Sequence, residues 1–95
     1  MAVYAIAQSR ITDPGKMQAY IEAASPTLEA HNVKILAFDE AAEVIEGETT
    51  ERRLVILEFE SAEHFHRWYD SPEYTAARQL RMDAAIGTFM LARGL

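Results

Sequence analysis

The sequence contains no cysteine, and its 95 residues include only four glycines and three prolines. Without cysteine there is no disulfide framework and no thiolate chemistry. No glycine-rich phosphate loop and no GxSxG nucleophile motif occurs. No apolar run approaches the roughly 18 residues of a membrane-spanning helix, and the short apolar run at the N-terminus follows no basic leader. The composition therefore predicts a cytoplasmic protein with no membrane partner.

Positive charge is also scarce. The chain has 9 Lys and Arg against 15 Asp and Glu, a net charge of -6, and its longest basic run is Arg52-Arg53. A phosphate backbone would repel such a chain, so nucleic acid is not an expected partner. The length predicts one domain over residues 1–95. Hydrophobic residues make up 49% of this short chain, a surplus that a subunit interface would accommodate.

Hydrophobic periodicity and turn residues divide the chain into strands and helices. A strand over residues 2–11 is followed by a helix that begins at Pro14 behind the cap Asp13 and ends near His31 and Asn32. Pro26 predicts a kink or break near residues 24–25. A second strand covers residues 34–39, with a bulge at 40–42 and a resumption at 43–46. After a turn at 47–51, a third strand covers 52–59, and the last covers 86–92.

The stretch over residues 59–81 contains the only tryptophan and two of the four tyrosines. Ser61 is a good N-cap for one helix. Asp70-Ser71-Pro72 interrupts it, because a residue before proline avoids the helical conformation. Ser71 and Pro72 then begin a second helix. The stretch predicts two helices with aromatic side chains gathered at their joint.

The resulting order β-α-β-β-α-β is that of a ferredoxin-like α+β fold, with a four-stranded antiparallel sheet and its helices on one face. The other sheet face should be polar, yet both faces of the strands are apolar. Val3, Ala5 and Ala7 oppose Tyr4 and Ile6 in the first strand, and the third strand, over residues 52–59, repeats the pattern. We therefore expect a second copy of the chain to cover the outer sheet face, giving a homodimer.

Four segments, TDPGKMQAY, EVIEG, VILEF and WYDSPEYTAARQLR, resemble domain-of-unknown-function family 1330 over nearly the whole chain. The turn after the first helix, His31-Asn32-Val33, departs from the family's usual small or glycine-rich turn. The motif positions are Asp13, Tyr20, Glu46, Gly47, Glu58, Trp68, Tyr69, Ser71, Pro72, Tyr74 and Arg81. The resemblance implies a dimeric α/β barrel, in which two ferredoxin-like units join sheet to sheet. It implies no activity, because that superfamily includes cofactor-free monooxygenases, haem-degrading enzymes, lactone isomerases and ligand-binding regulatory domains.

The aromatic joint offers the main candidate site. Aromatic side chains at helical spacing are usually core, but Trp and Tyr also carry polar groups that need partners when buried. Rings combined with hydroxyls and an arginine are typical of small-molecule sites. The candidate ligand-binding residues are Tyr20, Trp68, Tyr69, Tyr74 and Arg81.

His31 and Glu58 are weaker candidates for proton transfer. His31 at the helix end also fits a structural role beside the helix dipole, and a third reading makes it a haem ligand. Glu58 shares a strand face with Ile56, and an inward carboxylate there would need a partner from Arg10, Arg53, Arg81 or Arg93.

No metal motif occurs, and we expect neither a metal nor a cofactor. His64 and His66 are two residues apart on a helix, so they point in different directions and cannot share a metal. Both are expected to be solvated.

Two functions remain open from the sequence. In the first, a homodimer binds a small organic molecule between sheet and helices, and acts as a cofactor-independent enzyme of the monooxygenase or isomerase kind. In the second, the protein is a non-catalytic dimerisation or interaction module, whose aromatic joint only locks the helices to the sheet.

Overall fold

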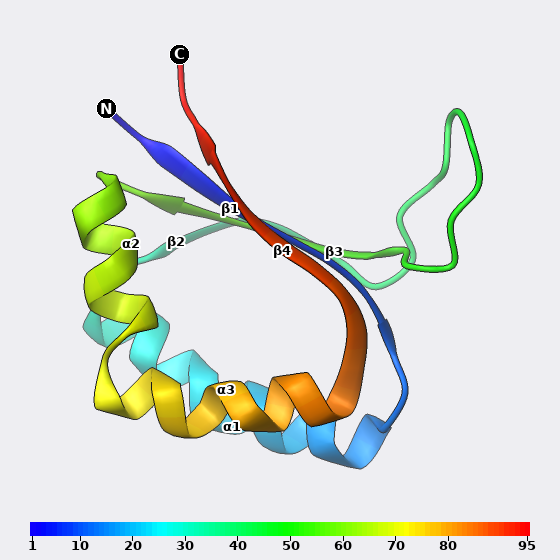
Figure 1. Ribbon diagram of the computed structural model, residues 1–95, viewed down its shortest axis with the longest axis horizontal. Helices are drawn as coiled ribbons and strands as arrows, with labels where there is room; N and C mark the ends of the chain where they lie inside the picture. The colour runs from blue at the N-terminus through cyan, green and yellow to red at the C-terminus, as the bar shows by residue number, and fades with distance from the viewer.

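The computed structural model describes residues 1–95 as four strands and three helices in one sheet-and-helix unit (Figure 1). The order confirms the predicted β-α-β-β-α-β plan with a divided second helix. The elements are β1 (Val3–Ile11), α1 (Pro14–Ala30), β2 (Lys34–Asp39), β3 (Arg53–Phe59), α2 (Ala62–Tyr69), α3 (Pro72–Ala84) and β4 (Ala85–Arg93).

All strand pairs are antiparallel, and the sheet order is β2-β3-β1-β4. At the centre of the sheet, Ala5 lies opposite Leu57 of β3 and opposite Leu91 of β4. Figure 1 shows the three helices on one side of the sheet and no segment of the chain over the other. This arrangement confirms the ferredoxin-like fold.

The inner sheet face carries the core. Val3, Ala5, Leu57 and Phe59 are all 5% exposed or less, and they pack against buried side chains of the helices. Trp68 is the largest of these helix residues. The strand alternation read from the sequence is therefore confirmed, because neighbouring residues of one strand face opposite sides of the sheet.

The outer sheet face is apolar, and its side chains are only partly buried. Ile6 lies opposite Ile56 on one neighbouring strand and opposite Met90 on the other, so all three share this face. Ile6 and Ile56 are half-buried, whereas Met90 is 57% exposed. An apolar strip across the middle of a sheet is unusual for a face in water.

The three predicted helix starts are confirmed by their caps. The Asp13 carboxylate accepts a hydrogen bond from the backbone N–H of Lys16 at 3.1 Å. Ser61 and Ser71 cap α2 and α3 in the same way. Ser71 is also buried, and its hydroxyl donates to the carbonyl oxygen of Trp68 at 2.8 Å. One serine thus ends α2 and begins α3.

The end of α1 is also as predicted, but the break at Pro26 is not. Asn32 adopts the left-handed conformation with φ of 56° just after the helix. Helix α1 continues without interruption through Pro26. Pro26 and Glu22 are exposed, so the carbonyl that loses its helical partner can bond to water instead.

The connection after β2 corrects two further predictions. No bulge forms at residues 40–42 and no strand resumes at 43–46, because residues 40–52 form one loop. The Asp39 carboxylate accepts a hydrogen bond from the N–H of Ala41 at 2.9 Å and turns the chain away from the sheet. Ile45 has nothing to pack on and is 78% exposed. The bulge lies earlier, between Ile35 and Ala37.

We predict that Ser71→Ala destabilises the protein by about 1–2 kcal/mol, because it removes the cap of α3 and leaves a buried N–H without its acceptor. Urea unfolding at a fixed protein concentration measures this free energy. Ser25→Ala is the matched control. Ser25 is exposed inside α1, where alanine is the better helix former, so that variant should be as stable as the wild type or slightly more stable. Equal stability of the two variants would contradict the capping role.

Candidate functional site

The space between the inner sheet face and the helices contains two adjoining cavities, one of about 450 Å³ and one of about 90 Å³. Four residues line both of them, Ala7, Arg53, Arg81 and Phe89. Strand β1 contributes Ala7, β3 contributes Arg53, α3 contributes Arg81 and β4 contributes Phe89. The fold therefore brings four elements to one interior space.

The smaller cavity lies beside the aromatic joint. Tyr20 of α1 and Tyr74 of α3 line it, with their hydroxyl oxygens 2.9 Å apart. The Trp68 ring lies 4.0 Å from the Tyr74 ring, and its indole N–H donates to the Thr27 hydroxyl at 3.0 Å. Tyr74 and Trp68 are almost fully buried, so their polar atoms have partners inside the protein.

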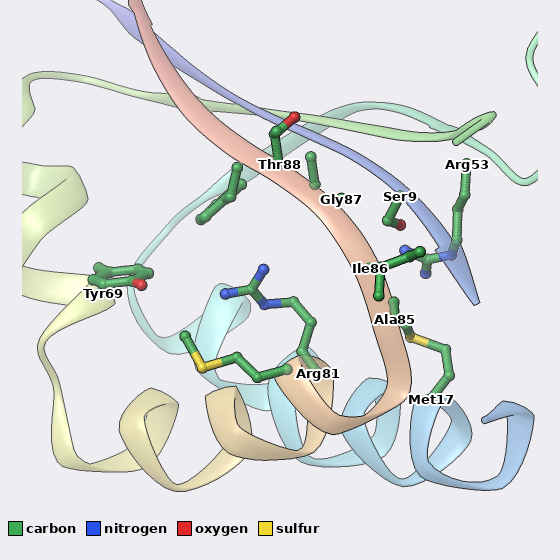
Figure 2. A pocket seen from close by; sticks show the side chains of 12 residues that line it. Ser9, Met17, Arg53, Tyr69, Arg81, Ala85, Ile86, Gly87 and Thr88 are labelled. Atoms are coloured by element: carbon green, nitrogen blue, oxygen red, sulfur yellow. The ribbon is translucent and has the colours of Figure 1, made fainter. Parts of the chain in front are cut away.

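The larger cavity opens between α3 and the strands β1 and β4. Figure 2 shows Arg81 extending from α3 toward the sheet, with Tyr69 on the far side of the same space. Arg53 enters from the sheet side (Figure 2). Methionines and the ring of Phe89 complete much of the wall. The cavity is thus mainly apolar, with two guanidinium groups at its border.

Neither arginine has an acidic partner. The Nε atoms of Arg53 and Arg81 are buried and make no hydrogen bond. Arg53 is only 7% exposed as a whole residue. Each guanidinium lies over a ring instead, Arg53 at 4.9 Å from the Phe38 centroid and Arg81 at 5.1 Å from that of Phe89.

Burial raises the pKa of the Tyr20 hydroxyl far above its ordinary value, and the neighbouring Tyr74 raises it further. Arg81 and Arg53 act in the opposite direction without overcoming the burial. Tyr20 therefore remains a neutral hydroxyl at any physiological pH, able to donate or accept a hydrogen bond.

The five candidate ligand-binding residues of the sequence analysis lie at these cavities. Tyr69 and Arg81 line the larger one, and Tyr20, Trp68, Tyr74 and again Arg81 line the smaller one. From the sequence, Arg53 is a candidate only as a partner of Glu58. Its position offered a signal, because it has the same strand parity as Val55 and Leu57, which face the helices.

His31 and Glu58 lie away from these cavities. His31 is the C-terminal cap of α1 and lines a separate hollow of about 240 Å³, with Nε2 at 3.6 Å from the Glu73 carboxylate. Glu58 lies on the outer sheet face opposite Tyr4. The carboxylate does not point inward, and its partner is Lys34 of the adjacent strand at 3.6 Å rather than one of the four arginines considered for an inward position. Arg53 and Arg81 lie on the other side of the sheet.

His64 corrects a further expectation, whereas His66 confirms it. His66 is exposed, but His64 is only 6% exposed. Its ring accepts a hydrogen bond from the N–H of Glu60 at 3.0 Å and lies 2.5 Å from the carbonyl oxygen of His31. The buried face of α2 includes His64 because this ring also packs edge-on against Phe59. His64 therefore joins α2 to the end of α1.

No three His, Cys, Asp or Glu side chains gather in a group that could hold a metal ion. None of the helices is long and apolar enough to span a membrane.

Tyr20 generates a prediction about alkaline stability. An unfolded tyrosine loses its proton near pH 10, whereas folded Tyr20 keeps it, so the unfolded state binds fewer protons above that pH. The free energy of unfolding should therefore fall as the pH rises above about 10, and Tyr20 adds no pH dependence below it. We expect Tyr20→Phe to remove about 1.4 kcal/mol per pH unit of this slope.

Urea unfolding of the wild type and the variant from about pH 8 to about pH 11 measures that slope. Ser25→Ala removes a hydroxyl from an exposed position of the same helix and is the matched control, which should keep the wild-type slope because it changes no titrating group. Parallel slopes for Tyr20→Phe and the wild type would show that Tyr20 ionises freely in the folded protein.

Solved structures of other proteins share this architecture. A protein of unknown function from Rhodopseudomonas palustris is 18% identical, with a TM-score of 0.82 over 99% of this chain and 82% of that one. SnoaB, a cofactor-independent oxygenase from Streptomyces nogalater, is 9% identical, with a TM-score of 0.67 over 99% and 93%. A dimeric protein of unknown function and ferredoxin-like fold from Bacteroides fragilis is 16% identical, with a TM-score of 0.59 over 98% and 96%. These likenesses show the fold that dimeric α/β barrel proteins share.

No curated protein matches the sequence significantly. One family model does match, and it covers residues 2–95. The match confirms the resemblance read from the sequence motifs. The chain therefore belongs to the family described as domain of unknown function DUF1330.

Proposed function

We propose that this protein binds a small organic molecule in the space between its sheet and its helices. The observation that carries the proposal is the larger cavity, whose volume of about 450 Å³ lies within the range of small-molecule sites. Its walls combine apolar side chains with the guanidinium groups of Arg53 and Arg81. A cavity with a few convergent polar groups in an apolar wall suits the orientation of a small ligand.

The proposal includes a cofactor-independent enzyme as one form. Arginine side chains and a protonated Tyr20 can stabilise negative charge that develops on a bound molecule. None of the residues that line the two cavities is Asp, Glu or His. A base for proton removal would therefore have to come from the bound molecule. The oxygenase from Streptomyces nogalater, which has the same fold, is a precedent for chemistry without a cofactor.

The alternative is a non-catalytic dimerisation or interaction module. The smaller cavity favours this alternative, because the space beside the buried Trp68 and Tyr74 is only about 90 Å³. The larger cavity favours ligand binding, because a side-chain cluster that only locks helices to a sheet has no use for empty space of that size.

We predict that a fragment screen followed by protein NMR identifies small molecules that shift the backbone amide signals of Ala7, Arg81 and Phe89. Ala7 borders both cavities, so Ala7→Leu should fill part of the space and weaken binding by about tenfold or more. Ala76→Leu is the matched control, because Ala76 is exposed on α3 and lines neither cavity. A screen without any hit at these residues would favour the interaction module.

We also propose that the protein is a homodimer formed through its outer sheet face. The apolar side chains of Ile6, Ile56 and Met90 support this arrangement, as does the dimeric neighbour from Bacteroides fragilis. A stable interface covers about 800 Å² on each partner, which a four-stranded sheet face can supply. Lys34 and Glu58, paired at 3.6 Å, would lie toward the β2 edge of the contact.

We predict that Ile56→Lys converts the dimer into a monomer, because a charge at the centre of the apolar face cannot be solvated once the sheets meet. Analytical ultracentrifugation of the wild type and the variant measures the mass. Thr75→Lys adds the same charge on the exposed side of α3 and should leave the dimer intact. A wild-type protein that sediments as a monomer would overturn the proposed dimer.

A further inference from the structure

We infer that the small molecule carries a carboxylate, and that Arg53 and Arg81 bind this group together at the border of the two cavities. The inference rests on the proposed ligand binding and names the chemical class of the ligand. The free protein holds the positive charges of Arg53 and Arg81 inside the fold without a negative partner, which is energetically unfavourable.

Arg53 is buried without an ionic partner. Arginine is almost never buried to 7% exposure unless its charge is paired. The chain contains three ion pairs, and they involve His31, Lys34 and His66 rather than any arginine. The Nε atoms of Arg53 and Arg81 are moreover buried without a hydrogen-bond acceptor. Both side chains therefore have unused hydrogen-bonding capacity that faces the protein interior.

The negative charges of the protein lie away from the two cavities. The chain has 15 acidic residues, yet none of them lines either cavity. Glu58, the one carboxylate within β3, is paired with Lys34 on the opposite face of the sheet. The protein therefore keeps its own anions away from the two arginines, and a bound anion would be their only partner.

The two arginines reach the same interior space from different elements. Arg53 comes from β3 and Arg81 from α3, and both border both cavities. Figure 2 shows the two side chains at the larger cavity. The ring of Phe38 lies under one guanidinium and that of Phe89 under the other. These contacts restrict the guanidinium planes before any ligand binds, which reduces the entropy lost on binding. Both charges also act on Tyr20, so all three groups share one electrostatic environment.

The chemistry of the walls selects the ligand class. A guanidinium presents two parallel N–H donors that match the two oxygens of a carboxylate. The same donors also match a phosphate, but the chain has no glycine-rich loop whose backbone N–H groups would bind the further phosphate oxygens. Met17, Met82 and Phe89 offer an apolar surface to the rest of the molecule. The site thus fits a mainly apolar carboxylic acid, with the Tyr20 hydroxyl available as a further donor.

The test uses three probes with the same apolar body: 1-naphthoate, 1-naphthamide and 1-naphthyl phosphate. NMR titration measures the Kd of each for the wild type and for the variants Arg53→Met, Arg81→Met and Arg78→Met. Arg78 is the matched control, because it lies over the Tyr69 ring at 4.5 Å but lines neither cavity. We expect the wild type and Arg78→Met to bind naphthoate about tenfold more tightly than naphthamide, or better. Arg53→Met and Arg81→Met should each lose that preference and keep their affinity for naphthamide.

A second measurement does not depend on the folding of the variants. In the wild type, the side-chain Nε–H signals of Arg53 and Arg81 should shift on addition of naphthoate and stay in place with naphthamide. Equal Kd values for these two probes would overturn the carboxylate and leave the ligand site standing. Tighter binding of the phosphate would overturn it in favour of phosphate esters. If no probe binds at about 10 mM, the carboxylate inference fails, and an empty fragment screen would then remove the proposed function as well.

Discussion

The burial of the Trp68 ring is the interaction on which the rest of this structure depends. The indole contacts the rings of Phe59, Phe65 and Tyr74, and its N–H donates to Thr27 of α1. One side chain thus ties α1, α2, α3 and the central strand β3 together. Its polar edge matters as much as its area, because an indole N–H is tolerated in a core only when it has an acceptor.

The position of Trp68 also explains why the interior is not filled. The large rings gather where α2 meets α3, so the sheet and helices pack densely at that end. Toward β4 and the far end of α3 the lining residues include the small Ala7, Ser9 and Ala85, which leave room between the layers. Added bulk at Gly87 is excluded, since a Cβ atom there would lie 2.0 Å from the carbonyl oxygen of Gln8. The cavity is thus a consequence of residue size on the two inner surfaces.

The sheet separates two kinds of surface. On its inner side, an aromatic core lies beside a cavity that is bordered by Arg53 of β3 and Arg81 of α3, neither of which has an acidic partner. Its outer face is an apolar strip around Ile6 and Ile56, through which we propose the subunit contact. The strands β1 and β3 contribute to both faces, so a change in the register between them would alter the proposed ligand site and the proposed subunit contact together.

Much of the fold was predictable because its signals are local. Asp13, Ser61 and Ser71 predict the helix starts, because each caps a backbone N–H only three residues further along the chain. The alternation of side chains along β1 and β3 assigns residues to the two sheet faces. The absence of a break at Pro26 and of a strand at residues 43–46 has a different origin. Local pattern indicates what a segment tends to form, whereas water access at Pro26 and the lack of a packing partner for Ile45 decided the outcome.

The candidate site divides in the same way. The sequence by itself determined that Tyr20, Trp68, Tyr69, Tyr74 and Arg81 would lie on inward helix faces, since helical periodicity places them there. Only the tertiary structure decided that Arg53 joins Arg81, that His64 is buried, and that Glu58 pairs with Lys34 on the other side of the sheet. The physical reason is distance along the chain. Periodicity reports which side of its own element a residue faces, and the packing of elements far apart in sequence decides what it meets there.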